Sequence, residues 1–187
     1  TDGTVALTKT DYTDGGSEML IGQVLTELVG SGQLSREQVI VVSKVGYLQG
    51  RNYAFSQQRK AQGKPFKELV DIGEGLEHCI HPEFLEDQLG RSLERLNLET
   101  TDFYLLHNPE YYLEWGKRNG VALSDARSEY YRRIQNAFDF LEQMVEKKRI
   151  CFYGISSNTF PALAHDDEFT SLERLWQIAQ SISSNHH

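Results

Sequence analysis

Short apolar runs of strand length alternate along this chain with longer stretches in which hydrophobic residues recur every three or four positions. The helical spacing is clearest where Leu85, Leu89, Leu93 and Leu96 fall on one face, after a proline in the first turn. Helices that feed short, nearly all-apolar strands are typical of a parallel α/β sheet, whose strands are buried on both faces. The pattern therefore predicts a parallel α/β fold.

The predicted strands cover residues 39–44, 103–106 and 150–155, and residues 5–7 form a further strand-like run. The predicted helices begin at Ser17, Pro82, Tyr130 and Thr170, and Ser17 and Thr170 are expected to cap the first and last of them. Residues 45–81 and 110–128 are long, polar and interspersed with aromatic residues, so we expect functional loops there, with local helix within residues 45–81. Without an internal repeat or a linker, residues 1–187 are expected to be a single domain or part of one.

Three successive predicted strands end on polar groups. These are Lys44, His107 and the segment Ser156-Ser157-Asn158. Each has an ordinary explanation, because a lysine reaches solvent, a histidine can bond a backbone carbonyl, and serine and asparagine form turns. The carboxyl ends of parallel strands share one rim, however, and α/β proteins place their chemistry there. Their joint placement predicts an active site.

Composition limits the kinds of partner and the cellular compartment that we expect for this chain. The chain has 19 Lys and Arg against 27 Asp and Glu, a net charge of −8, and a pI near 5.2. This leaves no basic excess for nucleic acid or an acidic membrane. No apolar run approaches the ~18 residues of a membrane span. Cys79 and Cys151 lie far apart, so neither a disulfide framework nor a metal site is predicted, which favours the cytoplasm.

Four segments, in order, resemble the motifs of the aldo-keto reductase family, and the resemblance runs from about Tyr12 to Ile182. They are Tyr12-Thr13-Asp14-Gly15-Gly16-Ser17-Glu18 with Ile21-Gly22; Ser43-Lys44-Val45-Gly46; Arg91-Ser92-Leu93-Glu94-Arg95-Leu96 with Asp102 and Tyr104-Leu105-Leu106-His107-Asn108-Pro109; and Tyr153-Gly154-Ile155-Ser156-Ser157-Asn158. The resemblance implies an α/β TIM (β/α)8 barrel, incompletely represented by these 187 residues. The first strand and strands six to eight of such a barrel are not recognisable.

The resemblance also implies a role for each residue. Tyr12 would be the general acid, Lys44 the cation that activates it, and His107 the group that orients the substrate carbonyl. A free phenol has a pKa of about 10, and a nearby cation lowers that value. Ser156 or Ser157, together with Asn158, would hold the nicotinamide carboxamide of NADPH, which supplies the hydride.

One departure from the family is Leu7, which stands where an aspartate would pair with the lysine. We expect an NADPH-dependent reductase of a small aldehyde or ketone. One alternative is a Schiff-base aldolase or lyase on the same barrel, with Lys44 as nucleophile. Another is a non-catalytic barrel that binds a nicotinamide or a partner protein, which Leu7 favours. Five aromatic residues could line a substrate pocket, namely Tyr47, Tyr53, Tyr111, Tyr112 and Trp115. The substrate and the oligomeric state stay open.

Overall fold

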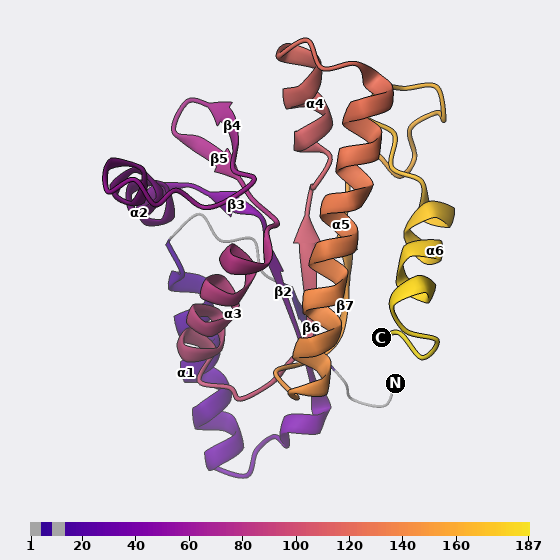
Figure 1. Cartoon of the computed structure of the whole chain (residues 1–187). Helices are drawn as coiled ribbons and strands as arrows, with labels where there is room; N and C mark the ends of the chain where they lie inside the picture. Colours follow the sequence, from indigo (N-terminus) through magenta and orange to yellow (C-terminus); the bar gives the residue numbers. More distant parts are fainter. Residues whose placement is uncertain (1–4, 9–13) are drawn as a thin grey trace.

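The computed structural model describes residues 5–8 and 14–187, which form alternating strands and helices (Figure 1). The strands are β1 (Val5–Thr8), β2 (Val39–Val45), β3 (Tyr47–Leu48), β4 (Val70–Gly73), β5 (Leu76–His78), β6 (Thr101–His107) and β7 (Ile150–Ser156). The helices are α1 (Gly16–Gly30), α2 (Gly50–Ala61), α3 (Pro82–Leu96), α4 (Tyr111–Arg118), α5 (Leu123–Glu146) and α6 (Leu172–Ile182), and Arg36–Gln38 form the 3-10 turn η1.

A parallel sheet contains β1, β2, β6 and β7 in that order. Lys44 of β2 is the register partner of Leu105 in β6, and Leu106 is the partner of Ile155 in β7. The predicted strands at residues 39–44, 103–106 and 150–155 fall within β2, β6 and β7, and the run at 5–7 falls within β1. The prediction of a parallel α/β sheet is therefore confirmed.

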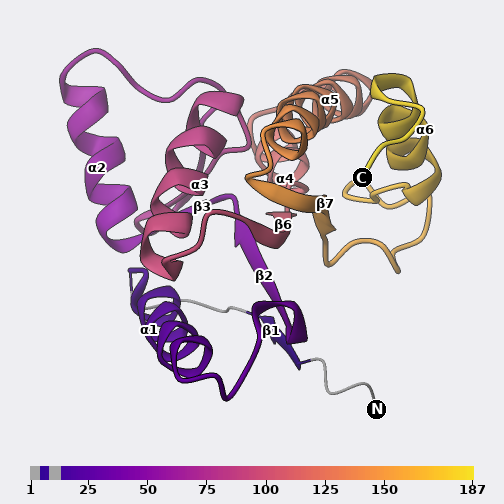
Figure 2. The same ribbon diagram turned by 90° about the horizontal axis from the view of Figure 1, so that it is seen from below.

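Helices α1, α3, α5 and α6 lie in an arc on one side of this sheet (Figure 2). Helix α3 packs between α1 and α5, and its Leu85, Leu89, Leu93 and Leu96 are all buried, as the spacing predicts. Burying a leucine side chain contributes about 1.5–3 kcal/mol. This row of leucines therefore anchors α3 and, with it, the strands on which it rests.

The opposite face of the sheet is less covered. Buried residues of β2 alternate with half-buried ones, and Ile40, Val42 and Lys44 lie on the half-buried face. Phe103 and Phe152 stack on the same face with ring centroids 5.1 Å apart, and Phe152 is 46% exposed. This face is the less covered one in the described sheet, because the helices pack against the other face (Figure 2).

Residues 45–81, which we call the inserted region, are predicted as a loop with local helix; they contain helix α2 and, in addition, a second sheet that the sequence pattern does not predict. Strands β3, β5 and β4 pair antiparallel in that order, and we call these three strands the inserted sheet. Glu74 and Gly75 join β4 to β5 with φ angles of 54° and 77°, a pair of positive values typical of tight hairpin turns. The strands have only 2 to 4 residues, which is too short for an alternating pattern to be read from sequence.

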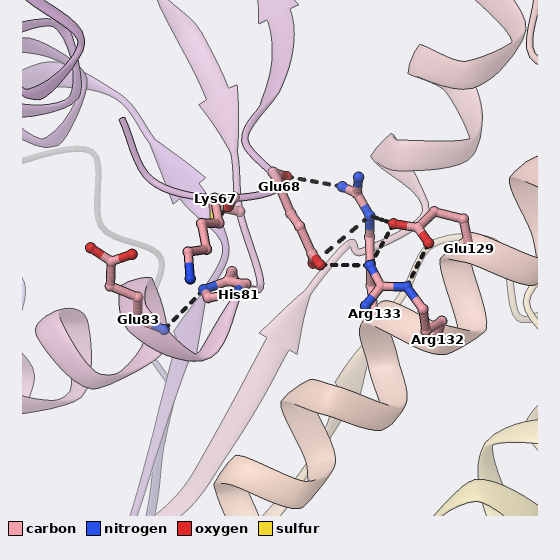
Figure 3. Close-up of polar contacts among 8 residues, drawn as sticks. Lys67, Glu68, His81, Glu83, Glu129, Arg132 and Arg133 are labelled. Carbon is pink, nitrogen blue, oxygen red and sulfur yellow. Dashed lines mark hydrogen bonds and ion pairs between the residues drawn. The ribbon is translucent and has the colours of Figure 1, made fainter. Parts of the chain in front are cut away.

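Four charged residues join this inserted region to α5 (Figure 3). The Glu68 carboxylate accepts from Nη2 of Arg132 at 2.6 Å, and its backbone carbonyl accepts from Nη1 of Arg133 at 2.9 Å. Glu129 accepts from Nε of the same arginines at 2.6 and 2.8 Å, and these bonds lower the pKa of its carboxyl to about 2. Half-exposed pairs each contribute about 0–1 kcal/mol, so they set orientation more than stability.

Residues 110–128 are also helical for most of their length. They form α4 and the first turns of α5, which begins at Leu123 rather than at the predicted Tyr130. The turns before Tyr130 are mostly polar and exposed, so apolar spacing does not mark them. From Tyr130 onwards the predicted core positions are buried up to Leu141, and the last of them, Val145, is partly buried.

Both predicted helix caps are off by one or two positions. Gly15, with φ of 94°, precedes α1, and Ser17 lies inside that helix. Ser171 caps α6 by accepting a backbone N–H at 3.2 Å, while the neighbouring Thr170 hydroxyl is bonded to the Tyr130 hydroxyl at 2.9 Å. No helix in the described part of the chain is both long and apolar enough to cross a bilayer.

Candidate active site

Lys44 and His107 lie at the carboxyl ends of adjacent strands and line one cleft of about 710 Å³. Lys44 is the register partner of Leu105, which is two residues before His107. Since side chains alternate along a strand, Lys44, Leu105 and His107 share one face of the sheet. The structure thus brings together two of the three predicted catalytic residues.

Tyr12, the third, lies outside the described residues. The described chain resumes at Asp14, which lines the same cleft together with Gly15. The Asp14 carboxylate accepts the backbone N–H of Arg51 at 2.9 Å, at the start of α2. The backbone of Leu7, the position that departs from the family, pairs with Val41 in the parallel sheet.

The two candidate serines are placed differently. Ser156 is the register partner of His107 and therefore shares its face of the sheet. The Ser157 hydroxyl instead closes a turn, in which it accepts the backbone N–H of Thr159 at 3.1 Å. Asn158 is exposed and lines the cleft. The geometry thus favours Ser156 over Ser157 as the partner of Asn158.

Sequence reasoning missed two residues that support this end of β7. Asn108, with φ of 47°, donates its backbone N–H to the Ser156 carbonyl at 2.7 Å. The carboxylate of the buried Glu110 accepts the backbone N–H of Asn158 at 2.8 Å, and burial raises the pKa of this carboxyl. The chain after β6 therefore fixes the backbone of Ser156 and Asn158.

Aromatic rings from the inserted sheet and α4 surround His107. The Tyr47 ring meets the His107 ring edge-on at 4.7 Å and the Tyr111 ring at 5.6 Å. The Tyr47 hydroxyl oxygen accepts from Nδ2 of Asn108 at 2.7 Å. Burial raises the pKa of Tyr47 further above the ordinary value of a phenol. Of the five aromatic residues predicted for a pocket, Tyr47 and Tyr111 line this cleft.

The last residue of the inserted sheet, His78, also reaches this site and was not singled out from the sequence. Its Nε2 lies 2.7 Å from the backbone carbonyl oxygen of His107. Burial lowers the pKa of His78 to about 4, so the ring is neutral at physiological pH. No periodic or motif signal marks His78, because its contact is made 29 positions away in sequence.

Other motif residues hold elements together instead of lining the strand ends. Glu18, 1% exposed on α1, accepts from the Ser43 hydroxyl at 2.9 Å and from Nε of Arg95 at 2.7 Å. Asp102 accepts the backbone N–H of Val41 and a guanidinium N–H, each at 2.7 Å. These contacts join α1, α3, β2 and β6, and Arg95 also lines the cleft.

Comparison with known proteins identifies the family to which this arrangement belongs. A model described as the aldo/keto reductase family matches residues 9–165. The chain therefore belongs to the aldo/keto reductase family. The fold of this family is the TIM (β/α)8 barrel, and the parallel sheet with its helices represents part of such a barrel.

Solved structures of low sequence identity are also similar. Aldo-keto reductase AKR11C1 from Bacillus halodurans is 19% identical, with a TM-score of 0.48, over 83% of this chain and 36% of that chain. Glycerol dehydrogenase AKR11B4 from Gluconobacter oxydans is 17% identical, with a TM-score of 0.48, over 90% of this chain and 35% of that chain. An aldo-keto reductase from Klebsiella pneumoniae in complex with NADPH is 20% identical, with a TM-score of 0.46, over 95% of this chain and 38% of that chain.

The chain thus spans little more than a third of the length of these solved structures. A search of the curated proteins found no match.

Proposed function

We propose that this chain carries the catalytic strand ends of an NADPH-dependent reductase of small aldehydes or ketones. The observation that supports this function is the placement of Lys44 and His107 on one face of adjacent strands, in the same cleft as Asn158. An ammonium, an imidazole and an amide at one sheet rim suit the polarisation of a carbonyl group. Membership of the aldo/keto reductase family also supports carbonyl reduction as the proposed activity.

In this proposal Tyr12 gives its phenolic proton to the carbonyl oxygen of the substrate. Lys44 stabilises the phenolate that remains, because a cation nearby favours the charged form of a phenol. His107 hydrogen-bonds the carbonyl oxygen and fixes its orientation toward the proton donor. General acid catalysis of this kind typically contributes ~10² to 10⁴ in rate.

Ser156 and Asn158 are the proposed contacts of the nicotinamide carboxamide. Their chemistry fits that group, since an amide and a hydroxyl can both donate and accept hydrogen bonds. Glu110 and Asn108 hold the backbone at Asn158 and Ser156, so the backbone that carries these two side chains is in place before binding. Bound NADPH would supply the hydride. The preference for NADPH over NADH comes from the family.

We also propose a cytoplasmic setting with a small-molecule carbonyl as the partner. Cys79 and Cys151 are both free thiols, in agreement with a reducing compartment.

The test is NADPH oxidation by the full-length protein with a panel of aldehydes and ketones. We expect turnover in the wild type and in Lys67→Met, a control at an exposed lysine, and a loss of ~10² to 10⁴-fold in Lys44→Met. Borohydride should trap no substrate on Lys44. A trapped imine would favour the aldolase alternative. NADPH binding without turnover of any carbonyl would favour the non-catalytic barrel, and either result would overturn this proposal.

A further inference from the structure

The end of β6 receives a hydrogen bond from outside the parallel sheet. The β2–β6 ladder ends at the pair Val45 and Leu106, so His107 lies one residue beyond it. There the donor to the His107 carbonyl is not a strand N–H but Nε2 of His78, at 2.7 Å. A carbonyl oxygen can only accept, so Nε2 carries the hydrogen and the ring is in the Nε2–H tautomer.

The inserted sheet is built to place this ring. The backbone N–H of Cys79 donates to the Gly46 carbonyl at 2.8 Å, which ties the end of β5 to the chain leaving β2. Gly46 has φ of 155°, and a Cβ there would lie 2.5 Å from Nε2 of His78 and 2.8 Å from the His107 carbonyl oxygen. Only glycine therefore leaves room for the His78 ring against the end of β6.

Two aromatic residues pack closely against the His78 ring. His78 is 2% exposed, and its ring meets Tyr47 edge-on at 5.6 Å and Tyr111 at 5.9 Å. Tyr47 in turn meets the His107 ring at 4.7 Å. His78 thus bonds the backbone carbonyl of His107 directly, and the Tyr47 ring packs against both histidine rings.

We propose that His78 is a positioning residue for the carbonyl reduction, which holds the end of β6 so that the His107 imidazole faces the substrate. This inference rests on the proposed function of His107. His78 itself touches neither substrate nor cofactor in this proposal. Its effect is expected on the chemical step, because a displacement of about 1 Å at a reacting group can cost about 10²-fold in rate.

The experiment compares three substitutions in the full-length protein. His78→Phe keeps a ring but removes the donor, and His78→Gln restores an amide N–H at a similar reach. Ser56→Ala is the matched control, because it removes a buried hydrogen bond to Glu77 in the same inserted region without contacting His107. The measurements are kcat, KM, NADPH affinity and the imidazole resonances of His107 by NMR.

We expect His78→Phe to lower kcat about 10- to 100-fold with little change in KM or NADPH affinity, and to shift the His107 resonances. His78→Gln should restore most of the wild-type kcat and return the His107 resonances toward their wild-type positions. Ser56→Ala should change kcat by no more than about twofold and leave the His107 resonances unshifted. If His78→Phe does not fold, His78→Asn replaces it, because the shorter amide does not reach the carbonyl.

Two results would overturn the inference. One is a His78→Phe protein with wild-type kcat and unshifted His107 resonances, and the other is an equal loss in the Ser56→Ala control. A wild type without carbonyl reduction would defeat the proposed function instead. The His107 resonances would then still decide whether His78 sets the position of that ring.

Discussion

The parallel sheet and the inserted sheet meet at the cleft, but they contribute different kinds of residue to it. The parallel sheet contributes strand ends that carry candidate reacting groups, Lys44, His107 and Ser156. The inserted sheet places Tyr47 in the cleft and His78 against the end of β6, and the Tyr47 hydroxyl and Nε2 of His78 are hydrogen-bonded to other protein groups. The candidate reacting groups and the groups that hold their neighbours in place thus come from separate layers of the chain.

This difference teaches how the site can be both ordered and reactive. His78 is buried, neutral and bonded to backbone, which are the conditions of a structural group. Lys44 lies on the half-covered face of the sheet and lines the open cleft. The predictions below test whether changes in the inserted sheet act on position and stability, and changes in the parallel sheet act on chemistry and cofactor.

The largest expected effect on stability is a pH dependence from His78. The folded pKa of about 4 lies below the unfolded value near 6.5, so between these values the unfolded chain binds the proton and the folded one does not. The free energy of unfolding should therefore fall by about 3 kcal/mol from pH 6.5 to pH 4. Chemical denaturation of wild type and His78→Gln across this range measures it.

Other groups titrate in the same window, so the difference between the two proteins is the relevant quantity. Tyr47, Tyr111, His107 and Arg133 are the titratable or charged groups around the ring, and all four are unchanged in His78→Gln. Parallel pH curves for the two proteins would contradict a buried neutral His78.

A smaller loss of stability is expected from Gly46→Ala. The new methyl group would meet both His78 and the His107 carbonyl, and the positive φ adds strain of about 1–3 kcal/mol. Gly120→Ala is the matched control, because Gly120 has φ of 72° but no atom within 4 Å of its Cβ position. Equal unfolding free energies for the two variants would show that the His78 ring does not need this space.

At the carboxyl-end rim of the parallel sheet, Glu110→Ala should weaken NADPH binding while leaving the fold intact. It removes the carboxylate acceptor of the Asn158 N–H, and a hydrogen bond to a charged group is worth about 1.5–3 kcal/mol, so we expect affinity to fall by up to about 150-fold. Glu114→Ala is the control, because Glu114 is one turn further along, in α4, and is half-exposed. Titration of both variants with NADPH is the measurement, and equal affinities would contradict a role of Glu110 at Asn158.

The smallest effect separates the two serines. Ser156→Ala should weaken NADPH binding by about 2- to 10-fold, the value of one hydrogen bond, because Ser156 shares the face of His107. Ser157→Ala should lower the melting temperature slightly through its turn with Thr159 and leave affinity nearly unchanged. The reverse order of affinities would place the carboxamide at Ser157.

The sequence predicted the parallel sheet because its strands are nearly uniform apolar runs. The polar residue that ends each run can be read from the sequence as well. Lys44 and His107 could therefore be selected before any coordinates. The inserted sheet could not, because its strands are only 2 to 4 residues long. His78 could not either, since its importance comes from a contact with a distant backbone carbonyl and not from local periodicity.

Helix boundaries show the same limit. The start of α5 is polar and exposed, so the apolar spacing that marks Tyr130 and Ile134 begins after the helix does. The cap at Ser171 and the hydrogen bond of Thr170 to Tyr130 depend on how α6 docks on α5. Sequence pattern identifies which faces are buried, and tertiary packing decides which neighbouring hydroxyl becomes the cap.

Carbonyl reduction by two tyrosine variants of the full-length protein, Tyr12→Phe and Tyr47→Phe, tests whether Tyr12 is the general acid. Tyr47 is a phenol beside His107, but burial raises its pKa and its oxygen already accepts from Asn108. We predict a loss of ~10² to 10⁴-fold in turnover for Tyr12→Phe, and less than about 10-fold for Tyr47→Phe, with NADPH affinity retained in both. An active wild type that is indifferent to Tyr12→Phe, or a larger loss for Tyr47→Phe, would contradict the account.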